Sequence, residues 1–520
     1  MFYTEKRDGF ARLGVLELEE KIRTPAMLEI ESMERFDFGK APYAVKNLFP
    51  EIYEKLKPKG EIAILTGLSA MMPREINEAF SEVRGNKAVF AVACATPLNV
   101  SVLIYLGADL VDNLMAIAKA YRGIYFLGDL EIEVEKLQRF PCNCEHCRRR
   151  EIRDLSKEET YEIVAKHNSE VLRQEVEKCR ILIAEESLRN YVESKSKLNP
   201  ELTALLRFSD FEEKNCFPRF RKSTLYFTSQ ESLNRFEVSY FFRRALECYE
   251  PKTKALLLLP CTAKKPYLTS RTHRTIRSAV KVNVNEIVIS SPLVVPREFE
   301  LLYPAVNYDT PVTGYWSDEE IDFVAKWLGK FVEKGKFEKI VAHVEGGYKK
   351  VVERALRDFD VVFTAEDGVL SESSLKKLKK ELEGYESFDL FAEMFSHALS
   401  YQFGIEAKGS VRGRYPEIEL VKGERIARFD LKYGNLDIYG ELAKELIRRG
   451  DYVVKIEEFE PSSTIFCAGV EYADEKILPN DVVVFYNSQI YGVGVARMQG
   501  KEMVEAEKGV AVEVRRKSRF

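Results

Sequence analysis

Short apolar runs alternate with helix-like segments in the middle of this 520-residue chain, and this alternation restricts its fold more than any other feature. The runs cover residues 255–260, 286–290, 339–343 and 361–364. Helical spacing marks the segments 318–334 and 347–357 between them. Apolar runs of this length between helices are typical of buried parallel strands. The sequence therefore predicts a central α/β domain with a parallel sheet, closed by a Lys/Glu-rich helix at 368–386.

Two further regions flank this domain. The N-terminal region has expected strands at 12–19, 21–30 and 108–112 and short apolar runs at 61–66 and 88–94. It also has helical segments at 73–83 and 99–107, and a long charged helix or helix pair at 156–197. After residue 451, short β-type runs alternate with turns, which predicts a small barrel. Because domains average roughly 100–200 residues, we expect an α/β multidomain chain. The expected domains are residues 1–200, 201–385, 386–450 and 451–520.

Composition narrows the class of protein. Hydrophobic residues make up 45% and charged residues 31%, which indicates a folded, soluble chain. Lys+Arg is 79 and Asp+Glu is 83, so the net charge of -4 excludes a generally polybasic protein. No secretory signal and no apolar run of the ~20 residues that span a bilayer is visible, so we expect a cytoplasmic protein without a membrane partner.

Three clustered thiols predict a metal site. Cys142, Cys144 and Cys147 form a C-x-C-x2-C pattern, and His167 follows on a predicted helix. Three thiolates and one imidazole suit a tetrahedral zinc site with no open position, so we expect a structural Zn. His146 is an alternative fourth ligand, but it sits inside the cysteine knuckle, and His167 is preferred.

A second motif combines a thiol with proton-transfer groups directly after the apolar run at 255–260. Between residues 251 and 285 there are eight Lys/Arg and no Asp/Glu, and this positive stretch favours both a thiolate and a phosphate backbone. Cys261 is the candidate nucleophile, with Lys265, Tyr267 and His273 as candidate proton-transfer groups. The alternatives left open are a merely buried Cys261, a Tyr267 that stacks on a base, and a His273 that contacts phosphate or caps a helix. The candidate phosphate contacts are Lys264, Arg271, Arg274 and Arg277.

The zinc segment resembles that of the tRNA-guanine transglycosylases, as do the Leu-Gly-Ala-Asp-Leu-Val-Asp stretch at 106–112 and the N-terminal Ala-Arg-Leu-Gly and Thr-Pro-Ala matches. The resemblance implies a TIM-like (β/α)8 barrel with Asp112 as the nucleophile that attacks the ribose. Too few residues precede the zinc site for a full barrel, so we expect a shortened, degenerate one. Relatives commonly pair through the zinc-bearing region, which implies a homodimer.

The segment 260–273 is similar to the Pro-Cys-x3-Lys-Pro-Tyr-x2-Ser-x2-His signature of the archaeosine synthases, which are paralogues of the archaeal transglycosylases. The resemblance implies a transferase that acts on tRNA carrying 7-cyano-7-deazaguanine in the dihydrouridine loop. It converts the nitrile toward the formamidine of archaeosine with a small-molecule amine donor: lysine, glutamine, asparagine or ammonia. With lysine, a radical-SAM partner protein would complete the reaction. A Cys261 thioimidate and direct amine attack both remain open, and Asp309 is a candidate for orienting the amine or the base.

The last 70 residues resemble a PUA domain, a small RNA-binding barrel. Gly469, Gly492 and Gly494 suggest close approach of a backbone, and Arg515 and Arg516 suggest phosphate contacts. Two rival functions stay open: a transglycosylase that exchanges the base through Asp112, and a non-catalytic tRNA-binding subunit.

Overall fold

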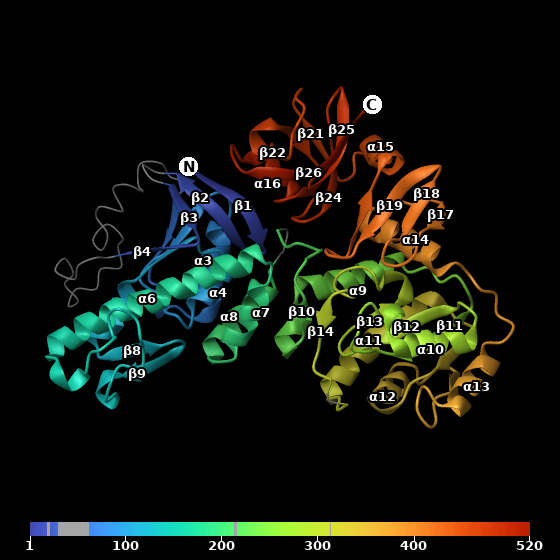
Figure 1. The fold of residues 1–520 in the computed structure, drawn as a ribbon, viewed down its shortest axis with the longest axis horizontal. Helices are drawn as coiled ribbons and strands as arrows, with labels where there is room; N and C mark the ends of the chain where they lie inside the picture. The colour runs from blue at the N-terminus through green and yellow to red at the C-terminus, as the bar shows by residue number, and fades with distance from the viewer. Residues whose placement is uncertain (18–20, 30–61, 213–215, 313) are drawn as a thin grey trace. The chain divides into compact units, whose positions relative to one another are not determined.

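The computed structural model describes residues 1–17, 21–29, 62–212, 216–312 and 314–520 (Figure 1). Residues 18, 19, 30 and 61 of the predicted N-terminal strands lie outside the described residues. The chain divides into two compact units. The first comprises residues 1–218, 454–479 and 495–514, and the second comprises 219–453, 480–494 and 515–520. No helix in the described part of the chain is long and apolar enough to cross a membrane.

The first unit begins with an antiparallel sheet of β1 (Phe2–Asp8), β2 (Ala11–Glu17) and β3 (Lys21–Thr24). A parallel sheet follows, in the order β4-β7-β6-β5. Its strands are β4 (Ala26–Leu28), β5 (Ile62–Leu65), β6 (Ala88–Ala91) and β7 (Leu110–Asp112). Its connecting helices are α3 (Pro73–Val83) and α4 (Val100–Leu106), and α5 (Leu114–Tyr121) follows β7. Four parallel strands, of which β5, β6 and β7 are joined by α3 and α4, agree with a shortened barrel.

A hairpin and three helices follow in the N-terminal part of the first unit. The hairpin β8 (Ile124–Leu127) and β9 (Leu130–Glu133) precedes α6 (Lys157–Ala184), α7 (Leu188–Ser196) and α8 (Pro200–Asp210). A capping box starts α6: the Ser156 hydroxyl accepts the Glu159 N–H at 3.2 Å, and the Glu159 carboxylate accepts the Ser156 N–H at 2.8 Å. The region 156–197, predicted as a helix or a helix pair, is a pair that consists of α6 and α7.

A five-stranded sheet organises the second unit, in the order β13-β12-β11-β15-β16. Its strands are β11 (Ala255–Pro260), β12 (Asn285–Ile289), β13 (Val294–Pro296), β15 (Lys339–Ala342) and β16 (Val361–Phe363). All neighbours pair in parallel except β12 and β13. The predicted parallel sheet is confirmed, with one antiparallel strand at its edge.

Side chains of β11 alternate between two apolar layers. Leu256 and Leu258 pack with residues of α9 (Phe236–Cys248) and α11 (Asp318–Gly335), whereas Leu257 and Leu259 pack with residues of α10 (Arg271–Val280) and α13 (Glu372–Glu381). Helices thus cover both faces of the sheet, as in doubly wound α/β folds. Figure 1 shows α10 beside the yellow-green strands β11 and β12.

The remaining elements form a small α+β region and a C-terminal sheet. The first has α14 (Leu390–Phe403), α15 (Gly440–Arg449) and an antiparallel sheet of β17 (Ser410–Arg412), β18 (Glu419–Lys422), β19 (Glu424–Asp430) and β20 (Asn435–Ile438). The C-terminal sheet has the order β22-β26-β25-β24-β21-β23. Its strands are β21 (Val453–Ile456), β22 (Thr464–Phe466), β23 (Val470–Ala473), β24 (Val482–Tyr486), β25 (Ile490–Ala496) and β26 (Val510–Arg519).

We predict that Leu258→Ala destabilises the second unit by about 2–5 kcal/mol, because the fully buried side chain leaves a cavity in the strand that carries the site. Both tryptophans, Trp316 and Trp327, belong to this unit, so urea unfolding followed by tryptophan fluorescence isolates its transition. Leu370→Ala, at a side chain that is 42% exposed, is the control. Equal transitions for the two variants would contradict the expected core position.

Candidate active site and metal centre

The second unit reverses its strand order beside β11. The chain passes from β11 through α10 to β12 on one side, and later returns to place β15 on the other side. In open α/β sheets, ligands bind at the carboxyl ends of the strands where the order reverses in this way. Cys261 is the first residue after β11, so the sequence motif lies at this position. The Cys261 N–H donates to the Ile289 carbonyl at 2.9 Å, which fixes its backbone to β12.

Cys261 faces a phenol across the switch point. Its Sγ lies 3.2 Å from the Tyr348 hydroxyl, which comes from the first turn of α12 (Gly346–Ala355), directly after β15. Burial raises the pKa of Tyr348, and the neighbouring Cys261 sulfur raises it further. The phenol therefore keeps its proton and donates it in a hydrogen bond when the sulfur is a thiolate.

The glycine pair at the start of α12 sets the position of Tyr348. A Cβ on Gly347 would lie 2.3 Å from the Trp316 ring, so the close approach of backbone and indole requires glycine. Trp316 in turn packs edge-on against the Tyr348 ring, with centroids 5.1 Å apart.

Lys265 lies close enough to Cys261 to interact with it electrostatically. Its side chain is 9% exposed, and its Nζ lies 3.8 Å from Asp309 Oδ1 and 4.4 Å from the centroid of the Tyr308 ring. Burial lowers the pKa of Lys265, and Asp309 and Cys261 offset part of this shift. A lysine whose proton is held less firmly suits proton transfer near neutral pH. The Asp309 carboxylate is 64% exposed and is accessible to a ligand.

Tyr267 is buried, contrary to a role in stacking on a base. Its phenol is hydrogen-bonded to the phenol of Tyr308, which donates to Ser290 Oγ at 2.6 Å. Burial raises the pKa of both phenols. This chain of hydroxyls fixes the loop after β11 against the end of β12.

His273 is also buried and uses both ring nitrogens. Arg297 donates from Nη2 to His273 Nδ1 at 2.7 Å, so the ring proton sits on Nε2 and is donated to the Pro260 carbonyl at 2.9 Å. Burial, followed by the positive charge of Arg297, lowers the pKa of His273 to about 3. The imidazole stays neutral at physiological pH and positions the backbone beside Cys261. Ser270 caps α10 by accepting the His273 N–H at 3.2 Å.

Arg297 is fully buried and is paired with two carboxylates. Its Nε donates to Glu286 at 2.6 Å, and its Nη1 pairs with Glu300. Glu300 also accepts the Leu268 N–H at 2.8 Å, so this network holds the loop between β11 and α10 from a second side. The signature therefore divides in two: Cys261 and Lys265 line the site, whereas Tyr267, Ser270 and His273 hold the loop.

The predicted metal ligands gather in the first unit. Ligand atoms of Cys142, Cys144, Cys147 and His167 all lie within 4.8 Å of one another, and Cys144 Sγ is 3.5 Å from His167 Nδ1. The three thiols come from the loop after β9, and His167 comes from the N-terminal half of the long α6.

Groups behind the cluster orient its imidazole. His167 Nε2 donates to the Phe126 carbonyl at 2.8 Å, which leaves Nδ1 free of its proton and directed at the thiols. The Tyr125 ring stacks on the imidazole with centroids 4.1 Å apart. The adjacent Asn168 accepts the Phe126 N–H at 2.9 Å and donates to the Ile124 carbonyl at 2.9 Å, which fastens β8 to α6. This set of donors fits a metal ion.

Asp112, the candidate base-exchange nucleophile, is 1% exposed at the end of β7. Its Oδ2 accepts the Ala93 N–H at 2.8 Å, and its Oδ1 accepts the Leu114 N–H at 2.9 Å at the start of α5. Burial raises the pKa of Asp112 to about 6, although both backbone bonds oppose the shift. Through these two hydrogen bonds, the Asp112 carboxylate holds the backbone at Ala93 and at the turn from β7 into α5.

The candidate RNA contacts fall into different settings. Lys264, Arg271 and Arg274 line one cavity, whereas Arg277 donates to Asn283 Oδ1 at 3.0 Å. A Cβ on Gly492 would lie 2.4 Å from the Arg516 carbonyl, and one on Gly469 would lie 2.8 Å from the Phe459 ring. These close contacts account for the glycines at 492 and 469 by packing within the C-terminal domain. Gly494 lies on the buried strand β25.

Sequence reasoning did not single out Tyr348 or Arg297 as site residues. Tyr348 carries one visible signal, a tyrosine after two glycines at the start of a helix that follows a buried strand. Arg297 lies in a Pro-Arg-Glu segment that gives no indication of burial.

Comparison with known proteins identifies four stretches of the chain. Residues 60–201 match the queuine tRNA-ribosyltransferase model, and 238–382 match a domain of unknown function. Residues 388–447 match a pre-PUA domain model, and 447–517 match the PUA domain model. A solved protein of unknown function is 57% identical, covers 54% of this chain and 99% of its own, and superposes with a TM-score of 0.50.

Two curated relatives extend over most of the chain. The archaeosine synthase subunit alpha of Methanosarcina acetivorans is 38% identical over 463 residues, which are 82% of this chain and 74% of that relative. The archaeosine synthase of Haloferax volcanii is 35% identical over 463 residues, which are 84% of this chain and 78% of that relative.

A ribosyltransferase-like domain, a doubly wound domain with a thiol at its switch point and a PUA domain together define a tRNA-modifying transferase. The chain belongs to the archaeosine synthase family. The predicted resemblance and the multidomain α/β class are thereby confirmed. The four domain boundaries, the homodimer and the radical-SAM partner stay predictions.

We predict that Tyr348→Phe slows alkylation of Cys261 by iodoacetamide at pH 7 about ten-fold or more, because a hydrogen bond to a charged group contributes ~1.5–3 kcal/mol. Peptide mass spectrometry distinguishes Cys261 from the other eight cysteines. Tyr315→Phe, at a 79% exposed phenol of the same unit, is the control. An unchanged rate in Tyr348→Phe would remove the phenol from the site.

Proposed function

We propose that this chain modifies a tRNA base that carries a nitrile, 7-cyano-7-deazaguanine, and joins an amine to it to form an amidine on the way to archaeosine. The main support is the placement of Cys261, Lys265 and Tyr348 together at the switch point of the central sheet. The names of the relatives and the PUA match support tRNA as the partner.

A nitrile carbon is electrophilic but reacts slowly with an amine, so the first step uses the thiol. Lys265, as a neutral amine, takes the Cys261 proton. The thiolate then adds to the nitrile carbon, and the Lys265 ammonium gives the proton to the nitrile nitrogen. One C–S bond forms, one C–N π bond is lost, and the product is a thioimidate. Tyr348 stabilises the sulfur while it is charged, through the contact of 3.2 Å.

The second step releases the thiol. The amine donor adds to the thioimidate carbon, the C–S bond breaks, and an amidine remains on the base. Lys265 transfers the proton lost by the incoming nitrogen to the departing sulfur. Ammonia gives the formamidine directly, whereas lysine gives an amidine that keeps the lysine carbons. The exposed Asp309 carboxylate, beside Lys265, orients the ammonium form of the donor before it enters.

The test incubates the protein with tRNA bearing the nitrile base and each candidate amine, followed by mass analysis of the nucleosides. We expect the base to gain the mass of the amine, and Cys261→Ser to reduce the rate at least a hundred-fold, because the covalent route is lost. Without amine, the wild type should form a protein–RNA adduct that survives a denaturing gel.

Cys248→Ser, at another half-buried thiol of the second unit, is the control. It should retain both the mass gain on the base and the protein–RNA adduct. Incorporation of labelled free guanine would indicate base exchange instead, and binding without any mass gain would indicate a non-catalytic subunit. Full activity in Cys261→Ser would exclude the thioimidate and leave direct amine attack.

We further propose that the cysteine–histidine cluster holds zinc in a structural role. Three thiolates and one imidazole are the donor set of closed tetrahedral zinc sites, and such sites stabilise the fold. Cys142, Cys144, Cys147 and His167 would bind the ion, and the loop after β9 would be fastened to α6.

Metal analysis of the purified protein should give one zinc per chain, with the content reduced several-fold in Cys144→Ser and His167→Ala. His146→Ala is the matched control, since this histidine lies beside the cluster and pairs with Glu145 at 3.4 Å. Loss of zinc in His146→Ala with retention in His167→Ala would reverse the assignment of the fourth ligand.

A further inference from the structure

The surface of α10 carries a hollow that the chemistry above does not use. This α10 groove has a volume of about 580 Å³ and is lined by Lys264, Thr269, Arg271, Arg274, Thr275 and Ser278. Three of these residues are cationic, three carry hydroxyls, and none is acidic. The groove begins in the loop that also carries Cys261 and continues along the helix that follows.

Within the part of the chain that the structure describes, the three cations of the groove have no acidic partner. Lys264, Arg271 and Arg274 form no ion pair with a described residue, and Arg274 uses Nε and Nη2 only on the Thr269 carbonyl, at 3.0 and 2.6 Å. Arg277, on the same helix, instead lies 4.0 Å from the Glu286 carboxylate. The positive charge is thus concentrated at the groove.

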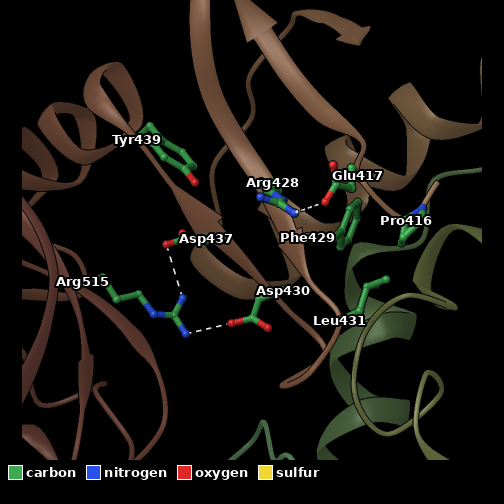
Figure 2. A pocket seen from close by; sticks show the side chains of 9 residues that line it. All are labelled: Pro416, Glu417, Arg428, Phe429, Asp430, Leu431, Asp437, Tyr439 and Arg515. Atoms are coloured by element: carbon green, nitrogen blue, oxygen red, sulfur yellow. Dashed lines mark hydrogen bonds and ion pairs between the residues drawn. The ribbon is translucent and has the colours of Figure 1, made fainter. Parts of the chain in front are cut away.

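The C-terminal arginines offer a contrast. Arg515 pairs with Asp430 at 2.9 Å and with Asp437 at 3.4 Å, and Arg516 pairs with Asp437 and covers the Tyr439 ring at 3.9 Å. Figure 2 shows Arg515 directed at both carboxylates across a cavity of about 430 Å³ that Glu417 also lines. These arginines are satisfied by acids of β19 and β20, and their charge is balanced locally.

We infer that the α10 groove binds the sugar–phosphate backbone of the RNA substrate, next to the nucleotide presented to Cys261. This inference rests on the proposed function and assigns one RNA contact within it. A row of uncompensated cations with hydroxyl donors matches phosphate and ribose oxygens. The groove has no aromatic lining on which a base would stack, so it suits the backbone rather than a free nucleotide.

The loop geometry links this grip to the chemistry. Lys264 is adjacent to Lys265, and the same loop is held by His273 on Pro260 and by Glu300 on Leu268. A phosphate held by Lys264 and Arg271 is therefore tied to a rigid segment whose neighbouring residues carry the thiol and the amine.

The experiment measures binding of an unmodified tRNA transcript over a series of salt concentrations. The variant Lys264→Gln, Arg271→Gln, Arg274→Gln should bind more weakly, with a salt slope lower by about two to three, since each lost phosphate contact removes ~0.7–0.9. The control Lys376→Gln, Lys379→Gln, Lys380→Gln removes the same charge from the exposed face of α13, and its slope should match the wild type. Urea unfolding confirms that both variants fold.

The two proposals fail separately, because the transcript carries no nitrile and the binding assay needs no chemistry. With nitrile-bearing tRNA, the groove variant should show a raised KM for tRNA with little change in kcat, because the groove holds the RNA in the ground state and in the transition state alike. A groove variant with the salt slope of the control would overturn the inference. An equal decrease of the salt slope in both variants would also overturn the inference, because it would indicate attraction of the RNA by overall charge.

Discussion

The hydrogen bond from His273 to the Pro260 carbonyl is the interaction on which the site depends most directly. It joins the last residue of β11 to the first turn of α10, and it closes the loop that carries Cys261 and Lys265. Arg297 fixes the tautomer that makes this bond, and two buried carboxylates hold Arg297. Breaking a buried ion network of this kind is costly, so the loop is held in one conformation. A thiol on a fixed loop keeps its distance to Tyr348 without reordering during the reaction.

The chain separates its tasks among elements of different character. The parallel sheet of the second unit supplies a rigid edge for chemistry, and the α10 groove beside it supplies charge. The first unit contains four parallel strands and the Cys/His cluster, and its Asp112 accepts hydrogen bonds from two backbone N–H groups.

Much of this was predictable from the sequence, because strong local patterns coincide with tertiary roles. The apolar run at 255–260 is β11 to the residue, and α3 occupies the predicted 73–83, since each has unambiguous periodicity and flanking breakers. The gathering of Cys142, Cys144, Cys147 and His167 was predictable, because their spacing in the sequence is typical of metal coordination. The positions of Tyr267 and His273 in the fold were not predictable, because a sequence motif does not show which of its side chains are buried. Tyr348 was missed because it joins Cys261 through strand order, over 87 residues of sequence. The sequence predicted phosphate contacts for Arg515 and Arg516 and did not reveal their ion pairs, because the carboxylates that neutralise them lie 79 to 85 residues away.

The packing of Gly347, Trp316 and Tyr348 has an optical consequence. Trp316 is one of only two tryptophans in the chain, and the other, Trp327, is stacked on Phe242 at 4.4 Å, within the helical layer. The indole that touches the Tyr348 ring is thus a built-in fluorophore at the edge of the site. A ligand bound beside Cys261 would alter the surroundings of Trp316 through the Tyr348 ring, which contacts both residues. The emission spectrum of the unlabelled protein therefore carries a record of occupancy, separate from turnover.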